Sequence, residues 1–591
     1  MRRLDNRFSA VTAAVVLALS ITAIGCGDTL LGDDGPSTPY PGGRWSPPEP
    51  TFGNFTQTDV ELPMSDGVIL VADVNYPADL ETGERANGSF PVILTQNPYG
   101  GNIAATAGSF FVSRGYIFAG VDVRGTSRSG GSGAELFTPR TAEDGAELVA
   151  WASRLGGSDG NVGLWGCSFL GINQLEAATQ LGPDSPVKAM IPGCFTGDSY
   201  RDTLFDNGIP GPIATAWPGV WPDALPGGDR GYYRDYWRNL DRVARAPAIA
   251  ATGIPMLMWV GWGEGGALGA LELYAALQNL SAGRGVFAPM RDDQPVTGRY
   301  QAIIGDWAHA GGLDQGIELQ WYDTWIKGID TGLPKNTRTP LHLQELASNR
   351  WINAKRYPLT DDSTALYLTQ AGELAGSAAA AGRDTLTWVP PEEVSASVEY
   401  TSAPFSDGAV LAGPMAARLE ISSSNTNAQL LIELLDVAPD GARAVISHGS
   451  VLGSRRGLDT DRSWTDADGE LIRPYLALDR DEPLLPDQRT GIDVPLVPTL
   501  WSIEPGHRLG VRLSTRPRAE NCGFVIGNPP WGCNLTEPMR ETLPGGVYTI
   551  HYGGTSASSV RLPLIAHGSF ETSRSITPPT VRDGSTLPGD W

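Results

Sequence analysis

The chain has 591 residues, of which 41% are hydrophobic and 18% charged, a composition typical of soluble globular proteins. This length exceeds what a single hydrophobic core supports, so we expect two or three domains. The formal net charge of −23 would repel a polyanion, which argues against nucleic acid as a partner.

The first residues have the pattern of an export signal. Three arginines precede the apolar run 10–24, which is shorter than the ~20 residues that span a bilayer and fits a signal peptide. The run ends at Cys26 in a sequence similar to a bacterial lipoprotein cleavage box, although Ala23 stands where leucine is usual. We expect either a cell-envelope lipoprotein anchored through Cys26, which would be its only membrane contact, or a secreted or periplasmic protein.

Export makes disulfides available to the remaining cysteines. Cys522 and Cys533 flank a segment rich in Gly and Pro, and a bridge between them is the preferred pairing. Cys167 and Cys194 would each end a neighbouring strand, so they either form a second bridge or stay as buried thiols.

Strand-like and helical segments alternate over much of the chain that follows. Residues 57–80 predict a β-hairpin, and Thr141 opens a predicted helix with a capping-box-like pattern. The alternation predicts a mostly parallel sheet with helices on both faces. The expected strands of this sheet are 91–96, 117–122, 162–166, 187–193, 255–261 and 300–305.

Residues 199–252 interrupt this alternation with many aromatic residues and prolines, and end in a predicted helix over 234–244. An insert at the carboxyl ends of parallel strands would overhang the ligand crevice. The insert is therefore either a lid or an excursion that only packs.

The character of the chain changes near residue 350. Short β-like runs separated by turn residues predict a β-sandwich, with strands at 365–369, 417–422, 429–437, 444–447, 507–514 and 546–552. The predicted organisation is a signal segment (1–26), a flexible linker (27–52), an α/β domain in two parts (53–198 and 253–350) around a helical cap (199–252), and an all-β domain (351–591).

The stretch GLWGCSFLG, residues 163–171, predicts a strand that turns sharply into a helix around Ser168. A serine hydroxyl becomes a nucleophile when a base takes its proton and a third group holds the base. The amino terminus of the following helix aims N–H groups at developing negative charge, and the Phe169 N–H is the expected first oxyanion donor.

The base is expected to be a histidine, because the pKa of imidazole lies near neutrality. The α/β portion contains His309, directly after the last predicted parallel strand, and His342, in a strand leading into the second domain. His309 is the expected base, since its loop would lie over the carboxyl edge of the sheet.

The acid that orients the base should follow a strand between the serine and the histidine, in the order Ser, acid, His of α/β-hydrolases. Glu264 follows the predicted strand 255–261 and is the expected acid. Asp198 and Asp306 are weaker candidates.

Six ordered stretches of the chain resemble the cocaine esterase and X-Pro dipeptidyl-peptidase family of serine hydrolases. They are MSDGVILVADVNYP, TQNPYGG, GYIFAGVDVRGTSRSGG, GLWGCSFLGINQLEAA, VGWGEGG and GDWAHAGG. The resemblance implies an α/β-hydrolase fold with a helical cap and a jelly-roll domain. It also implies that Ser168, Glu264 and His309 form the triad and that the Tyr99 hydroxyl is the second oxyanion donor. The family usually has aspartate where this chain has Glu264.

The residues two and three positions after the acid bear on specificity. The amino-acid ester hydrolases of this family carry acidic residues where this chain has Gly266 and Ala267, which argues against an amino-acid ester hydrolase and says less about a dipeptidyl-peptidase. Tryptophans near the nucleophile and in the insert suggest an apolar or aromatic acyl pocket; they are Trp165, Trp217, Trp221 and Trp262.

These features predict a carboxylic ester hydrolase that acts on small molecules through an acyl-enzyme on Ser168, without a cofactor or metal. An X-Pro dipeptidyl-peptidase or amidase of the same family stays open as an alternative. A surface protein that keeps the fold for binding alone is the second alternative.

Overall fold

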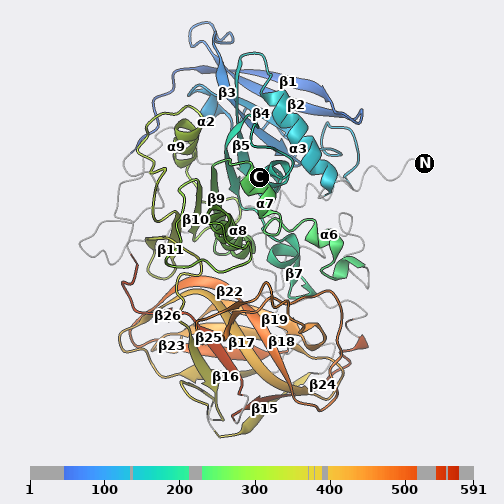
Figure 1. Cartoon of the computed structure of the whole chain (residues 1–591), viewed down its shortest axis with the longest axis vertical. Helices are drawn as coiled ribbons and strands as arrows, with labels where there is room; N and C mark the ends of the chain where they lie inside the picture. Colours follow the sequence, from blue (N-terminus) through green and yellow to red (C-terminus); the bar gives the residue numbers. More distant parts are fainter. Residues whose placement is uncertain are drawn as a thin grey trace.

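The computed structural model describes residues 45–133, 138–211, 229–370, 372–378, 380–388, 397–515, 539, 541–553 and 557–570. An α/β domain and an all-β domain stack along the long axis, and the short elements α6 and β7 of the insert lie beside their junction (Figure 1). Several predicted features lie outside the described residues: Cys26, the pair Cys522 and Cys533, and Trp217 and Trp221. No helix of the described part is long and apolar enough to cross a membrane.

The α/β domain is built on a ten-stranded sheet in the order β1-β2-β4-β3-β5-β6-β9-β10-β11-β12. The seven strands from β4 to β11 run parallel, and β1, β2 and β12 form antiparallel edges. All six parallel strands predicted from the sequence are present. The bounds are β1 Gly53–Pro63, β2 Ile69–Ala78, β3 Phe90–Asn97, β4 Ile117–Asp122, β5 Ser158–Cys167, β6 Val187–Gly193, β9 Met256–Gly261, β10 Tyr300–Gly305, β11 Leu341–Glu345 and β12 Arg350–Ala354.

Helices cover both faces of this sheet, as the alternation predicts. One face carries α3 (Pro139–Ala152), α4 (Phe169–Ala178), α7 (Ala246–Ala251) and α8 (Gly266–Ser281). The other carries α2 (Ser109–Val112) and α9 (Gln315–Trp325). The α3 helix begins at Pro139, before the predicted Thr141, because proline suits the first helical turn.

The register of the parallel strands fixes where their ends meet. Cys167 pairs with Gly193 across β5 and β6, and Gly305 pairs with Gly261 across β10 and β9. The last residues of four strands therefore share one edge of the sheet, and the loops that follow them carry Ser168, Glu264 and His309.

The all-β domain is of the jelly-roll type and encloses its own hydrophobic core. The change from the α/β sheet comes after Ala354, a few residues beyond the predicted boundary, because β12 still pairs with β11. The strands are β13 Thr364–Leu368, β14 Glu373–Ala375, β15 Gly382–Trp388, β16 Ser397–Ser402, β17 Ala409–Ser423, β18 Gln429–Val437, β19 Arg443–Leu452, β20 Trp464–Thr465, β21 Leu471–Arg473, β22 Thr490–Ile503, β23 Arg508–Ser514, β24 Gly546–Tyr552, β25 Ser559–Leu562 and β26 Leu564–Ile565.

The described part of the insert packs into the all-β domain. Its buried aromatic residues Tyr200, Phe205, Tyr233 and Trp237 belong to the hydrophobic core of that domain, which fits the packing alternative for these residues. The predicted helix over 234–244 is wrong beyond its first turn, since α6 ends at Arg238 and a bridge between Asp198 and Asp241 follows. The remaining elements are a π-helix at Tyr200–Leu204, β7 Phe205–Asp206, β8 Ile209–Pro210, a 3-10 turn at Asp229–Gly231 and α6 Asp235–Arg238.

Candidate active site

Ser168 lies at the tip of the turn between β5 and α4, in a backbone conformation that non-glycine residues rarely adopt. Its φ is 62° and its ψ is −128°. Such strain persists only where the surroundings enforce it, and it is common at functional sites. Here the Ser168 N–H donates to the Gly193 carbonyl oxygen at 3.0 Å. A Cβ at Gly171 would collide with the same oxygen, so the second glycine of the motif allows α4 to approach β6.

Tyr99 reaches the serine from the turn that follows β3. Its hydroxyl donates to Ser168 Oγ at 3.0 Å and accepts from the Phe169 N–H at 3.4 Å. The Asn97 side chain shapes this turn, since it accepts from the Tyr99 N–H at 3.0 Å and donates to the Gly100 carbonyl at 2.8 Å. Although 45% of the residue is exposed, desolvation raises the pKa of the Tyr99 hydroxyl above its ordinary value.

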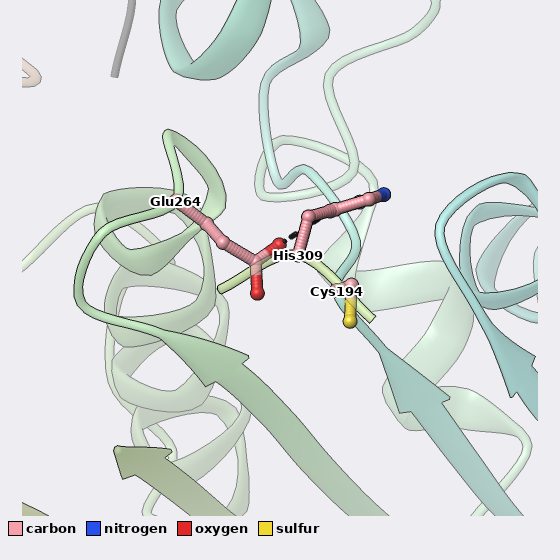
Figure 2. Close-up of side chains that lie close together, drawn as sticks. All are labelled: Cys194, Glu264 and His309. Carbon is pink, nitrogen blue, oxygen red and sulfur yellow. Dashed lines mark hydrogen bonds and ion pairs between the residues drawn. The ribbon is translucent and has the colours of Figure 1, made fainter. Parts of the chain in front are cut away.

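His309 and Glu264 form a hydrogen-bonded pair at the same edge of the sheet. His309 Nδ1 lies 2.8 Å from Glu264 Oε2, and the imidazole turns its other nitrogen away from the carboxylate (Figure 2). The Gly261 N–H donates to the second oxygen of Glu264 at 2.9 Å. Only 3% of the Glu264 side chain is exposed, against 21% for His309. A buried carboxylate held in this way fixes the orientation and tautomer of an imidazole.

Trp307 anchors the loop that carries His309, a role that the sequence reasoning missed. Its indole packs against Trp259 and Trp351, with ring centroids 6.1 Å and 5.7 Å away. Gly261 and Gly305 make room for it, since a Cβ on either would collide with Trp307. The glycines that end β9 and β10 were the available signal, because they mark a close approach of another segment.

Ser168 and His309 follow β5 and β10 at the same edge of the sheet, and no direct hydrogen bond joins them in the described part of the chain. Among the described residues, Ser168 Oγ bonds to Tyr99 and His309 bonds to Glu264. Catalytic hydrogen bonds often tighten only when substrate binds. A rotation of the Ser168 hydroxyl about its Cα–Cβ bond moves Oγ without any change in the backbone.

The weaker acid and base candidates lie elsewhere. His342 is buried within β11, where Asn353 and Gln301 contact its two nitrogens and desolvation lowers its pKa to about 4. Asp198, directly before the insert, pairs with Arg201 of the insert and accepts a hydrogen bond from Tyr475 of the all-β domain. Asp306 is exposed, three residues before His309. Glu264, not Asp306, holds the hydrogen bond to His309 Nδ1 that the orienting acid would make.

The two predicted pocket tryptophans within the described residues are packing residues, which corrects the prediction for both. Trp165 is 6% exposed, packs edge-on against Phe118, and donates its indole N–H to Glu318 at 2.7 Å. Trp262 is 7% exposed and donates to the Gln344 carbonyl at 2.8 Å. Neither presents an open apolar surface to a ligand.

A disulfide joins Cys167, the residue before the serine, to Cys194, which follows β6. This pairing settles the two alternatives for these cysteines. Cys194, Glu264 and His309 are also a group whose donor atoms lie within 4.8 Å of one another (Figure 2). The disulfide occupies the Cys194 sulfur, so the oxidised protein presents only Glu264 and His309 as metal ligands in this group.

Comparison with known families finds two matches along the chain. The model of the X-Pro dipeptidyl-peptidase (S15 family) matches residues 66–220. The model of the X-Pro dipeptidyl-peptidase C-terminal non-catalytic domain matches residues 334–560. The two matches follow the order of the α/β and all-β domains.

Individual proteins resemble the chain over most of its length. Cocaine esterase from Rhodococcus is 22% identical, covering 87% of this chain and 99% of the esterase. A CocE/NonD family hydrolase from Staphylococcus aureus superposes with a TM-score of 0.66 at 19% identity, covering 86% and 94% of the two chains. An aminopeptidase from a marine sediment thaumarchaeon superposes with a TM-score of 0.67 at 17% identity, covering 91% and 99%. At these identities, the two solved structures show the shared fold alone.

Proposed function

Because this chain belongs to the cocaine esterase and X-Pro dipeptidyl-peptidase family of serine hydrolases, we propose that it cleaves carboxylic esters through an acyl-enzyme on Ser168. In this proposal His309 is the general base and Glu264 orients it. The Tyr99 hydroxyl and the Phe169 N–H bind the oxyanion. The single observation that carries it is the His309–Glu264 pair, 2.8 Å apart, beside a serine turn whose Oγ receives a hydrogen bond from Tyr99.

The reaction begins when an ester carbonyl takes the place beside Tyr99 that Ser168 Oγ holds in the free protein. Ser168 Oγ turns to His309, gives up its proton and attacks the carbonyl carbon. The developing oxyanion accepts hydrogen bonds from Tyr99 and Phe169, and one such donor contributes about 3 kcal/mol to catalysis. Because the raised pKa of Tyr99 keeps its hydroxyl protonated, that hydroxyl remains a donor at neutral and mildly alkaline pH.

The second half of the reaction releases the acid. His309 passes the proton to the departing alkoxide, the carbon–oxygen bond of the ester breaks, and the alcohol leaves. Water then enters, His309 removes its proton, and the hydroxide attacks the acyl-serine. Collapse of the second tetrahedral intermediate restores the Ser168 hydroxyl and releases the carboxylic acid.

The start of α8 supports a substrate without an α-ammonium group. Gly266 and Ala267 occupy the positions where acidic residues would face an ammonium. A Cβ at Gly266 would collide with the Phe195 carbonyl oxygen, and Ala267 is 1% exposed. An acidic side chain at Gly266 would therefore require the backbone to move. We propose an apolar or aromatic acyl group instead, in keeping with the aromatic residues of the insert.

Matched substrates test this choice directly. Methyl phenylacetate and methyl phenylglycinate differ only in the α-amino group, and we expect faster hydrolysis of the phenylacetate. Nitrophenyl esters and Xaa-Pro-nitroanilides separate the esterase from the dipeptidyl-peptidase. Turnover of the anilides alone would contradict the ester proposal while leaving the serine mechanism in place.

The place of action is part of the same proposal. The arginines and apolar run before Cys26 support export, with a lipid on Cys26 or with simple cleavage. Mass spectrometry of the mature amino terminus separates these two outcomes, and an intact leader on the mature protein would contradict both.

A further inference from the structure

The Cys167–Cys194 disulfide lies inside the candidate active site. Cys167 directly precedes Ser168, and the two cysteine Cα atoms are 5.0 Å apart. Cys194 is 4% exposed and adopts a φ of 45°, in the left-handed region. The ester reaction proposed above does not use this bridge.

The Cys194 sulfur also belongs to a cluster of metal-ligating atoms. Cys194, Glu264 and His309 follow the neighbouring strands β6, β9 and β10, and one donor atom of each lies within 4.8 Å of the others (Figure 2). In a tetrahedral zinc site, neighbouring sulfur, nitrogen and oxygen donors are about 3.5 Å apart. Side-chain rotation can supply a contraction of about 1 Å in a group already this compact.

We propose that Cys194, Glu264 and His309 form a latent site for a thiophilic divalent cation such as Zn²⁺, which the disulfide keeps closed. Thiolate and imidazole together favour zinc and cobalt over calcium or magnesium. The Gly261 N–H already holds the non-bonding oxygen of Glu264 at 2.9 Å, the kind of outer contact that orients a ligating carboxylate. Water or the freed Cys167 thiolate completes the tetrahedron.

Reduction opens the site. A phosphine breaks the sulfur–sulfur bond and is oxidised to the phosphine oxide. Water supplies the oxygen atom and the two protons, which leaves thiols on Cys167 and Cys194. The cation then displaces the Cys194 proton and takes a lone pair of neutral His309, so binding releases a proton and strengthens as pH rises.

The consequence for catalysis rests on the proposed function. A cation on Nε2 of His309 blocks the atom that would take the serine proton. A cation on Nδ1 leaves the only imidazole proton on Nε2, which then cannot act as a base. In either case hydrolysis stops, so the disulfide protects the base from metal.

A matched pair of variants tests the site without relying on activity. Cys167→Ser frees Cys194 without any reductant, whereas Cys194→Ser also lacks the bridge but loses the sulfur ligand. Both keep the other three cysteines. Titrated with Co²⁺, Cys167→Ser should bind about one ion per chain with a thiolate-to-cobalt charge-transfer band. Cys194→Ser and the oxidised wild type should lack this band.

Phosphine-reduced wild type provides a second route if Cys167→Ser does not fold, and it should give the same band. The proposal is overturned if the band is equal in both variants, or if it is missing from folded protein whose Cys194 thiol is titratable. Zn²⁺ should inhibit ester hydrolysis by Cys167→Ser, and EDTA should restore the activity. The affinity of Cys167→Ser for Zn²⁺ should be about 100-fold or more above the affinity of Cys194→Ser. Equal zinc inhibition of both variants also counts against it. If no ester is cleaved at all, the cobalt spectra still decide whether the site exists.

Discussion

The hydroxyl of Tyr99 donates a hydrogen bond of 3.0 Å to Ser168 Oγ, across 69 residues of chain. The same hydroxyl accepts from the Phe169 N–H, so in the free protein the serine oxygen takes the place beside Tyr99 that the oxyanion would occupy. A carbonyl oxygen that displaces it finds its donor already oriented, which is the condition for electrostatic stabilisation without reorganisation.

Replacing Tyr99 by Phe removes this donor and keeps the ring. We expect kcat to fall about 100-fold with little change in KM, because the lost hydrogen bond strengthens in the transition state. Steady-state kinetics on a nitrophenyl ester measure both constants. Tyr274→Phe is the matched control, since its hydroxyl bonds to the Lys355 carbonyl away from the serine. A rise in KM at constant kcat would show that Tyr99 only binds substrate.

Glu264 tests the length and charge of the orienting acid separately. Glu264→Gln keeps the length and removes the charge, and we expect kcat to drop by roughly 10³-fold or more because the imidazole loses its tautomer and the stabilisation of its charged form. Glu264→Asp keeps the charge and withdraws it by about 1 Å, which should cost less. Equal activity of the Gln variant and the wild type would remove Glu264 from the mechanism.

Gly261, at the end of β9, packs closely against the loop that carries His309. A Cβ there would collide with the Trp307 carbonyl oxygen, so Gly261→Ala should displace the loop and lower kcat about tenfold or more. Gly182→Ala is the control, because nothing lies within 4 Å of its added Cβ. Loss of activity in both variants to the same degree would contradict a specific role for the Gly261 contact.

Glu318 makes the stability of the fold depend on pH. The carboxyl is buried under Trp165, and desolvation raises its pKa from 4.5 to about 8. Between those values the folded state holds a proton that the unfolded state releases, so stability falls as pH rises from about 4.5 to about 8. The free energy of unfolding of Glu318→Gln should therefore rise relative to that of the wild type across that interval, by on the order of a few kcal/mol.

Urea unfolding at pH 5 and pH 9 checks this prediction. Glu49→Gln, on the surface, reports the effect of removing a solvated charge. If the Glu318→Gln variant and the wild type change stability in parallel over this range, Glu318 is ionised in the fold and the prediction is wrong.

Most of the α/β sheet could be predicted from the sequence, because its parallel strands are short, continuous apolar runs. The predicted run 187–193 and the observed strand β6 have the same bounds. Chain order and the positions of the strand ends were also enough to predict Glu264 and His309 as a pair, since parallel strands end at one edge of the sheet. Local patterns carry this information.

Tertiary contacts decided the rest. The predicted helix over 234–244 ends early because Asp241 pairs with Arg462 of the all-β domain at 2.7 Å, a contact that no local pattern contains. Trp165 looked like a pocket residue beside the serine, but its partner Glu318 lies 153 residues away and holds it in the core. The bridge between Cys167 and Cys194 likewise depends on strand order, which spacing alone leaves open.

The most direct measurement of the central claim is peptide mapping after reaction of the folded full-length protein with a fluorophosphonate. We expect one phosphonyl adduct, on Ser168, that is lost in Ser168→Ala and forms far more slowly in His309→Ala. An adduct on another residue, or no adduct on folded wild-type protein, would contradict it.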